Sequence, residues 1–426
     1  MQFPMDFVRE SFPALAEPDR VFLDNAAGTQ VPQGVVDVVS GHFAPGVQIG
    51  GGYRSSEDVD ATLQHARESA AVFLNADEPE EVFFGPNATA FIRLVGAAYG
   101  QFLTAGDQIV VTELDHEANI APWLALEKLE IEVKFWPVES DARLDVGKLD
   151  ALLTDRTRLV AVTKASNAVG TIVDLIPIAE RIHAIGGHLF VDAGHFAAHG
   201  PLDVRFFGCD FLVCSGYKAF GPHMGFLWGK RELMDSLSIV REDFVEGRTP
   251  DEPARPAKYE TGTNSYEAVA GMDAAIAYIE ELGRRSSEMP LAPQDAVGRR
   301  GDIRRGMQAI RHYERDLTGQ LLRRVGEISG VKIHGIDGPN FDAYRTPTLC
   351  FSVKGVAPPE VSRQLARQGI SVRDGHHHCP RLMRSLGLSE SEGAVRASFV
   401  HYNTYEEVNK FADALAQISA GVKVAK

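Results

Sequence analysis

Seven short, almost uniformly apolar segments between residues 81 and 228 constrain the fold more than any other feature of this sequence. Helical stretches separate these segments, which are residues 81–85, 108–112, 131–135, 158–163, 188–192, 210–215 and 225–228. Strands that are apolar on both faces belong to buried, mostly parallel sheets whose strands are joined by crossover helices. We therefore predict an α/β fold with a large domain built on a mostly parallel seven-stranded sheet.

Local signals place several helices around these strands. Helical periodicity begins near Val35, and residues 60–74 have the pattern of an amphipathic helix. A crossover helix is predicted over residues 174–185, with Asp174 as its N-cap and a glycine pair after its last residue. The glycine-rich stretch 45–53 lacks periodicity and is expected to be a loop.

A polar, basic and proline-containing stretch divides the chain of 426 residues. We predict an N-terminal arm and large domain over residues 1–285, a linker or surface excursion over 286–305, and a smaller C-terminal α+β domain over 306–426. The strand candidates of the small domain begin at Val331, Thr348, Ile370 and Val395. Thr404 and Glu407 form a capping box before the last helix. The first ~20 residues are expected to pack with the small domain.

Composition and charge exclude several classes of partner. The net charge of −15 argues against binding to nucleic acid, because phosphate-backbone binders need clustered Lys and Arg. No segment reaches the ~18 consecutive apolar residues of a membrane span, so no membrane partner is expected. The four cysteines are too few and too irregularly spaced for a disulfide framework: Cys209, Cys214, Cys350 and Cys379. We therefore predict a soluble, cytoplasmic protein.

Lys218 lies just beyond a strand candidate, in the sequence CSGYKAFGPHMG. A lysine that is removed from water loses some of its affinity for a proton, and such lysines form Schiff bases with aldehydes. One interpretation of Lys218 is therefore a Schiff base with pyridoxal 5'-phosphate (PLP). The other is an ordinary surface lysine on a turn.

Other polar side chains follow further strands, at the sheet edge where open parallel sheets bind ligands. Asp192 could keep a pyridine nitrogen protonated, and Ala88 with Thr89 could bind a phosphate at a helix N-terminus. His116 could stack on a cofactor ring, and Asn167 could donate a hydrogen bond to a phenolate or a substrate carboxylate. Each could instead be an ordinary cap, turn or core residue. Their recurrence at successive strand ends, together with Lys218, favours a single site.

The order of motifs along the chain resembles a known family. The motifs are NAAGTQVP, HEANIAPW, SNAVGT, VDAGH, CSGYKAFGPHMG, YETGTN and VRASFVHYN. In this order they resemble the cysteine desulfurase-like branch of the class V aminotransferase group, which are fold-type I PLP-dependent transferases. The resemblance spans nearly the whole chain.

The resemblance implies a role for each matching residue. Lys218 would be the Schiff-base lysine and proton carrier, His116 would stack on the cofactor ring, and Asp192 would pair with its nitrogen. Arg396 would bind the substrate carboxylate in a bidentate manner. The remaining cofactor contacts would come from Ala88, Thr89, Asn167, His195, Ser215, Tyr217 and, from a second subunit, Thr263. The family is dimeric, so the resemblance implies a homodimer with shared sites.

The sequence departs from the family at three places. His195 stands where many members have glutamine, and Tyr217 stands where they have histidine. In the loop VRDGHHHCPRLM, the family's sulfur-accepting cysteine aligns with His378, while Cys379 is one place later. Cys379 is either the displaced nucleophile or an incidental small residue. For the neighbouring histidines, His376 to His378, we expect a polar lid over the substrate rather than a metal site, because consecutive side chains do not converge on one ion without a turn.

Three functions stay open from the sequence. The first is a cysteine desulfurase that converts L-cysteine to L-alanine and places the sulfur on Cys379, with a sulfur-acceptor protein as a candidate partner. The second is a carbon–sulfur β-lyase, an epimerase or an aminotransferase of the same fold, without persulfide chemistry. The third is a non-catalytic scaffold or regulatory homologue. In the first two, an amino acid is the substrate, and Asn167, Arg396, His376 and His378 bind it.

Overall fold

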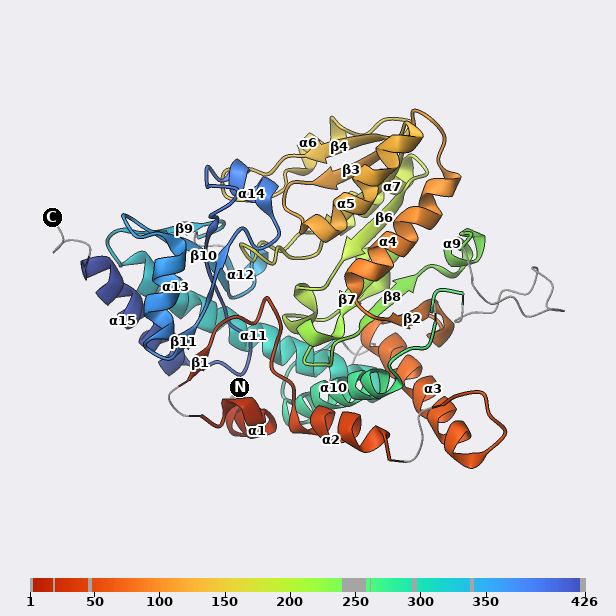
Figure 1. The fold of residues 1–426 in the computed structure, drawn as a ribbon, viewed down its shortest axis with the longest axis horizontal. Helices are drawn as coiled ribbons and strands as arrows, with labels where there is room; N and C mark the ends of the chain where they lie inside the picture. Colours follow the sequence, from red (N-terminus) through yellow and green to blue (C-terminus); the bar gives the residue numbers. More distant parts are fainter. Residues whose placement is uncertain are drawn as a thin grey trace.

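The computed structural model describes residues 3–17, 20–44, 48–239, 258–260, 262–292, 297–337 and 341–421. Its large domain contains one seven-stranded sheet with the order β2-β8-β7-β6-β5-β3-β4 (Figure 1). The strands are β2 (Val82–Gly85), β3 (Gln108–Thr112), β4 (Glu132–Trp136), β5 (Thr157–Thr163), β6 (His188–Asp192), β7 (Phe211–Ser215) and β8 (Gly225–Gly229). Strand β8 runs antiparallel to both of its neighbours, β2 and β7, and the other adjacent pairs are parallel. All seven predicted strands are confirmed, as is the mostly parallel sheet.

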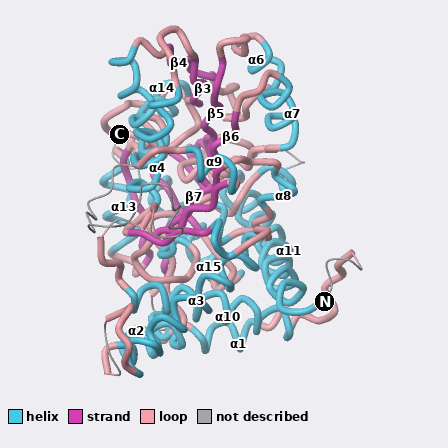
Figure 2. Tube along the Cα trace, turned by 90° about the vertical axis from the view of Figure 1, so that its right-hand side faces the viewer, coloured by secondary structure: helices cyan, strands magenta, loops and turns pink. Residues whose placement is uncertain are grey.

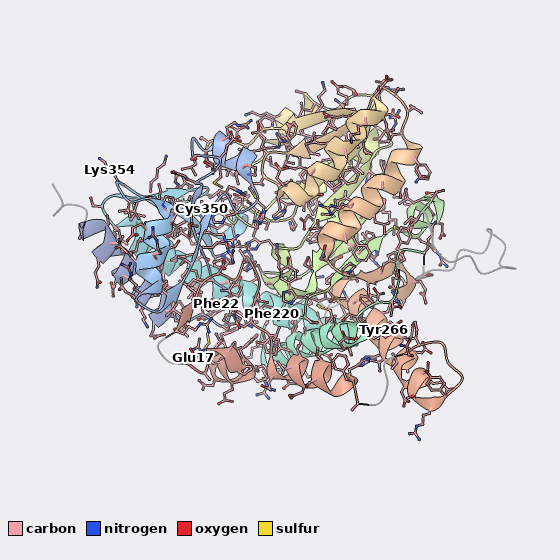
Figure 3. The ribbon with its side chains drawn as sticks, in the orientation of Figure 1. Glu17, Phe22, Phe220, Tyr266, Cys350 and Lys354 are labelled. Atoms are coloured by element: carbon pink, nitrogen blue, oxygen red, sulfur yellow. The ribbon has the colours of Figure 1, made fainter. Side chains whose placement is uncertain are left out.

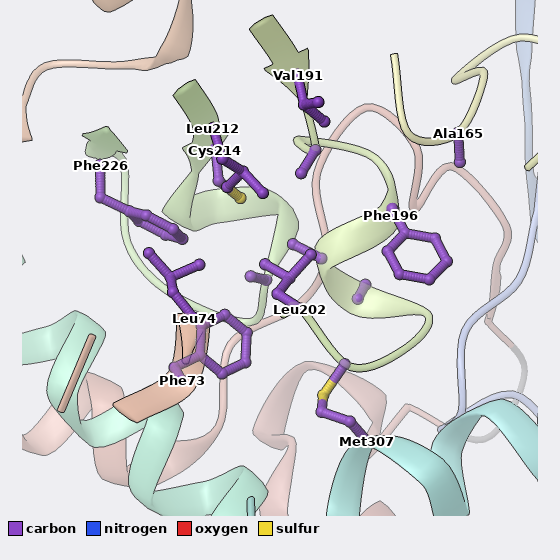
Figure 4. Packing of buried hydrophobic residues seen from close by; sticks show 14 of the residues in the cluster. Phe73, Leu74, Ala165, Val191, Phe196, Leu202, Leu212, Cys214, Phe226 and Met307 are labelled. Atoms are coloured by element: carbon purple, nitrogen blue, oxygen red, sulfur yellow. The ribbon is translucent and has the colours of Figure 1, made fainter. Parts of the chain in front are cut away.

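Side chains of each strand alternate between two hydrophobic cores. Phe83 and Val111 belong to the core on one face, and Phe84 and Val110 belong to the core on the other. Helices cover both faces, so the sheet lies between two helical layers (Figure 2). They include α4 (Ala88–Tyr99), α5 (Ala121–Leu124), α6 (Val146–Asp150), α7 (Ile176–Ala184), α8 (Val204–Phe207) and α9 (Arg231–Ser236). The larger core also contains Phe73, Leu212 and Met307, which bring strands and long helices together (Figure 4).

Four further helices pack beside the sheet: α2 (Gln33–His42), α3 (Arg54–Leu74), α10 (Tyr266–Arg285) and α11 (Gly298–Gly326). Helices α10 and α11 are antiparallel and touch through their backbones. A Cβ added to Gly283 would lie 1.7 Å from the carbonyl oxygen of Asp302. Helix α11 begins inside the stretch 286–305, so the predicted linker is shorter than expected. The charged composition of its first turns concealed the helix.

The C-terminal part forms a four-stranded antiparallel sheet with the order β12-β13-β10-β9. Its strands are β9 (Val331–His334), β10 (Thr348–Val353), β12 (Arg373–Gly375) and β13 (Ala394–Ser398). Helices α12 (Phe341–Tyr344), α13 (Pro358–Ala366), α14 (Pro380–Ser385) and α15 (Tyr405–Gly421) accompany them. Cys350 of β10 lies in this part of the molecule (Figure 3). The capping box is confirmed, since Thr404 Oγ1 accepts a hydrogen bond from Glu407 N at 3.2 Å and Glu407 Oε2 accepts one from Thr404 N at 3.1 Å.

The single strand expected from Ile370 is divided in two. Strand β11 (Ile370–Ser371) pairs in parallel with β1 (Val21–Phe22), whereas β12 pairs with β13. Near the N-terminus, helix α1 (Met5–Ser11) reaches the small domain through Arg9, whose NH1 donates to Glu407 Oε1 at 2.9 Å. Phe12 also packs edge-on against Phe220 of the large domain. Phe220 lies between the two domains in Figure 3.

Two helix starts differ from the predictions. Helix α3 begins at Arg54 rather than at residue 60, because most of its first turns are polar and exposed and give no apolar period. The N-cap of α7 is Leu175 rather than Asp174, although Asp174 Oδ1 accepts a hydrogen bond from Ile176 N at 3.3 Å. None of the helices in the described ranges combines the length and apolar content that a membrane span needs.

Candidate active site

Lys218 lies in a fixed turn at the carboxyl end of β7. It ends the 3-10 helix η7 (Gly216–Lys218) and is half-buried. Thr29, far away in the sequence, holds this turn from outside: its N–H donates to Tyr217 O at 3.0 Å, and its Oγ1 accepts from Phe220 N at 3.0 Å. Phe220 has a φ of 63°, so the chain reverses sharply just after the lysine. The backbone therefore fixes where the amine can reach.

Asp192 ends the adjacent strand β6 and lies close to the lysine. Its Oδ1 accepts a hydrogen bond from Gly194 N at 2.8 Å. Burial raises the pKa of this carboxyl, while the positive charge of Lys218 and the Gly194 hydrogen bond oppose that rise. A Cβ on Gly194 would lie 3.0 Å from Asp192 Oδ1 and 3.9 Å from Lys218 Cδ. The two predicted residues are thus brought together, with a glycine at their point of closest approach.

The N-terminus of α4 lies beside the turn that carries Lys218. Asn87 is its N-cap and accepts a hydrogen bond from Ala90 N at 2.9 Å, and Ser215 Oγ accepts one from Ala88 N at 3.2 Å. The backbone of β8 comes so close that a Cβ on Gly225 would lie 2.4 Å from the carbonyl carbon of Asn87. Half-buried Thr89 follows in the first turn. Ala88, Thr89 and Ser215 therefore meet at a helix N-terminus, which favours an anionic group.

His116 follows β3 and offers an uncharged ring to the site. Its Nδ1 accepts a hydrogen bond from Ala118 N at 3.0 Å, which assigns the proton of the neutral ring to Nε2. Burial lowers the pKa of His116 to about 3, and the charge of Lys218 adds to this effect. The neighbouring Asp115 was not predicted: it is fully buried, and burial raises its pKa to about 7. Its sequence context, ELDHE, gives no sign of that burial.

Arg396 brings the small domain into the site. It lies on β13 and is buried, with NH1 donating to Asn167 O at 3.0 Å and NH2 to Asp24 Oδ1 at 3.0 Å. Its Nε is buried and has no hydrogen-bond partner among the described residues. Burial lowers the pKa of Arg396, and the Asp24 carboxylate opposes this shift. Arg396 and Asn167 are therefore adjacent, as predicted for residues that bind one substrate.

Asp24 is a site residue that the sequence did not reveal. Arg373 binds its carboxylate with two nitrogens, Nε at 2.9 Å and NH2 at 2.7 Å from Oδ2, while Arg396 binds the other oxygen. The Asp24 carboxylate thus connects the buried Arg396 with the exposed Arg373. Its position after a two-residue strand, in VFLDNAAG, was the only available signal.

The histidine loop presents His378 to the site. The ring of His378 is exposed, and its centroid lies 5.0 Å from that of His116. Its carbonyl oxygen accepts a hydrogen bond from Glu117 N at 2.8 Å, and its N–H donates to His376 Nδ1 at 3.0 Å. His377 is buried instead, and its Nε2 donates to Ala394 O at 3.1 Å. The three histidines therefore point to different surroundings.

Cys379 is enclosed beneath this loop. It is 1% exposed and packs in the hydrophobic core with Leu382 and Met383. Its Sγ donates to Asn167 Oδ1 at 3.3 Å. Burial raises the pKa of the thiol far above its ordinary value, which suppresses the thiolate. In this loop conformation, the side chain exposed beside His116 is the imidazole of His378 and not the thiol of Cys379.

The remaining predicted residues lie around this centre in different ways. His195 is buried, and its Nε2 lies 3.2 Å from Thr346 Oγ1 and 3.0 Å from Thr348 Oγ1 in the small domain. The ring of Tyr217 stacks on that of His223, with centroids 5.1 Å apart. Thr263 is exposed. No cluster of three or more His, Cys, Asp or Glu suited to a metal ion occurs in the described ranges.

Comparison with known proteins agrees with this geometry. The family Aminotransferase class-V matches residues 21–290 and 303–411. The chain is 33% identical to a cysteine desulfurase of Synechococcus elongatus over 98% of its own length and 64% of that protein. It is 32% identical to a cysteine desulfurase of Yersinia pestis over 98% of its own length and 99% of that protein.

Two solved structures resemble the chain over nearly all its length. One is the apo cysteine desulfurase of Thermococcus onnurineus, with a TM-score of 0.86, 27% identity and 99% of both chains covered. The other is the cysteine desulfurase CsdA of Escherichia coli, with a TM-score of 0.81, 27% identity and 98% of both chains covered. The predicted fold-type I architecture is confirmed. The chain belongs to the class V aminotransferase family and, within it, to the cysteine desulfurase-like group of PLP-dependent enzymes.

Proposed function

We propose that this enzyme uses PLP to remove sulfur from L-cysteine and release L-alanine. The observation that carries the proposal is that Lys218 and the half-buried Asp192 meet at Gly194, beside a helix N-terminus. This set of groups fits PLP: an amine for its aldehyde, a carboxylate for its pyridine nitrogen, and N–H groups for its phosphate. The close contact between the backbone at Gly225 and the first residues of α4 supports the phosphate site. Any larger residue at position 225 would displace these residues of α4.

Each part of the site has a separate task. PLP supplies an electron sink conjugated to the substrate when it is bound. Lys218 would hold its aldehyde and, once released by the substrate, would move a proton at the substrate Cα. Asp192 would retain the proton on the ring nitrogen, and the neutral His116 would cover the ring face. The phosphate and the phenolic oxygen would be bound by Ala88, Thr89, His195, Ser215 and the hydroxyl of Tyr217.

Arg396 would position the amino acid by its carboxylate. Its guanidinium is already oriented by Asp24 and by Asn167 O, and its Nε is free to donate. The Asn167 amide is in contact with Cys379 and donates to His377 O at 2.9 Å, so the carboxylate site and the histidine loop share one side chain. We infer that His376 and His378 close over the substrate side chain from this loop.

We also propose that the enzyme is a cytoplasmic homodimer in which Thr263 completes the phosphate site of a second copy. The exposure of Thr263 in the single chain supports this proposal. Glu260, three residues earlier, anchors the segment: its Oε1 accepts hydrogen bonds from Phe84 N and Arg67 NH1, both at 2.8 Å. Asn264, the residue after Thr263, donates from Nδ2 to Phe84 O of β2 at 3.4 Å. A thiol-containing sulfur acceptor would be a further partner.

The test is product analysis of the PLP-loaded protein incubated with L-cysteine and a thiol reductant. Proton NMR should show alanine, with sulfide released in equal amount. The Lys218→Ala variant should lose alanine formation and the absorbance near ~420 nm of the lysine-bound cofactor. Pyruvate with ammonia in place of alanine would refute desulfuration and indicate β-elimination.

A further inference from the structure

The histidine loop offers two neighbouring side chains for chemistry, and the fold places only one of them in the open. His378 is exposed and faces His116, whereas Cys379 is buried against Asn167. The backbone makes this choice, because His377 and His378 both adopt left-handed conformations, with φ of 52° and 58°. Two successive residues of this kind turn the chain so that position 378 points outward and position 379 inward.

Hydrogen bonds from three directions hold the loop in this conformation. Glu117 N donates to His378 O at 2.8 Å, so the loop is joined to the residue after His116. Asn167 Nδ2 donates to His377 O at 2.9 Å from the end of β5. Within the loop, Cys379 N donates to His376 O at 2.8 Å. Together these bonds hold the loop in the conformation in which Cys379 is covered.

We propose that this enzyme passes sulfur directly to a thiol supplied from outside the chain, with His378 as the base that accepts the thiol's proton. Cys379 then packs the loop and carries no persulfide. This inference rests on the proposed desulfuration of L-cysteine and assigns its acceptor step. Of the two interpretations of Cys379 that the sequence left open, it favours the incidental packing residue over the displaced nucleophile.

The step balances without a further reactant. The incoming thiol gives its proton to a ring nitrogen of His378, and its sulfur attacks the sulfur of the substrate. A sulfur–sulfur bond forms while the Cβ–S bond breaks, and the bonding electron pair stays with Cβ. Cβ then takes a proton, so cysteine and the thiol yield alanine and a persulfide. The thiol sulfur is oxidised and Cβ is reduced.

The surroundings of His378 suit a base. Partial burial lowers its pKa, and positive charge on His376, Lys218, Arg396 and Arg373 acts in the same direction. An imidazole that is uncharged near neutral pH can accept a proton from a thiol. The ring beside it, that of His116, is itself uncharged near neutral pH.

The first experiment uses a single turnover. The PLP-loaded enzyme is mixed with less than one equivalent of L-cysteine, with and without dithiothreitol, and alanine is measured by NMR. We expect alanine only when dithiothreitol is present, at a rate proportional to its concentration. Alanine formed without thiol, with one extra sulfur on Cys379 by mass spectrometry, would overturn the inference while supporting desulfuration. No alanine in either arm would overturn both proposals.

Matched variants separate the two side chains. Cys379→Ser keeps the hydrogen bond to Asn167 and should retain thiol-dependent alanine formation. Complete loss of alanine formation with intact cofactor absorbance would contradict the packing role of Cys379. His378→Gln should slow the thiol-dependent step by about 10²-fold or more, with recovery at high pH where the thiol is already ionised. His378→Cys should yield alanine without added thiol. Replacing dithiothreitol by a small protein with one exposed cysteine tells whether a protein thiol is also accepted.

Discussion

Asp115 should make the stability of this protein fall as the pH rises from about 4 to about 7. The carboxyl is fully buried next to His116, and burial raises its pKa from 3.8 to about 7. Thr112 Oγ1 and Asn119 Nδ2 donate hydrogen bonds to it and oppose the shift, whereas the nearby Asp192 increases it. In the unfolded chain none of these contacts exists, so the carboxyl returns to its ordinary pKa.

The difference between the two pKa values sets the size of the effect. A rise of about 3 units corresponds to about 4 kcal/mol in the free energy of unfolding. Below about pH 4 both states are protonated, and Asp115 contributes no pH dependence. Between about pH 4 and 7 only the folded state keeps the proton, so stability declines by about 1.4 kcal/mol per pH unit. Above the folded pKa the decline ends.

The variant Asp115→Asn removes this titration while keeping the size of the side chain. Urea unfolding of the cofactor-free wild type and variant, at several values between pH 5 and 8, gives the comparison. The wild type should lose about 2 kcal/mol more than the variant between pH 5 and 7, because the slope is already halved at the folded pKa. Parallel curves over this range would show that Asp115 is ionised or solvated in the fold, and the reasoning would be wrong.

Three further predictions concern the site. Gly225→Ala should lower PLP affinity about tenfold or more in an absorbance titration, because its Cβ would displace Asn87; unchanged affinity would contradict the phosphate site. Arg396→Lys should raise KM for cysteine by roughly 10- to 100-fold, since one ammonium cannot bind Asp24, Asn167 O and a carboxylate in the same fork-like geometry. His116 should stay uncharged from pH 5 to 9, because its pKa is about 3; nitrogen NMR shifts that change in this range would refute this.

The large sheet could be predicted from the sequence because its strands are buried on both faces. In such strands almost every residue is apolar, so the signal does not depend on register or partner. Phe83 and Phe84 enter different cores, yet both are required to be apolar. Lys218 and Asp192 could be placed together for a related reason: parallel strands end at one edge of the sheet, and each residue follows its strand directly.

Contacts between distant segments could not be predicted in this way. Asp24 and Arg396 are 372 residues apart and meet because a parallel bridge joins Asp24 to Ser398 of β13, and Val21 and Val395 share one hydrophobic core. The strand expected from Ile370 is divided because β11 pairs with β1 whereas β12 pairs with β13. Local composition does not reveal these partners. The burial of Asp115 also depends on surroundings that the sequence does not show. Helix α11 was missed because its start is rich in arginine, and its buried contact with α10 uses glycine backbones.

The choice between His378 and Cys379 as the side chain that faces the site depends on the backbone of the histidine loop. From the sequence, Cys379 could be a displaced nucleophile or an incidental residue, because the side chain that faces outward depends on backbone angles. Left-handed conformations at His377 and His378 cost about 1–2 kcal/mol each. The three hydrogen bonds that hold the loop contribute about 0.5–1.5 kcal/mol each, enough to offset that strain. The contacts that stabilise the strained turn are therefore the ones that present His378 and cover Cys379, so the identity of the reacting group follows from the loop's anchors rather than from the order of its residues.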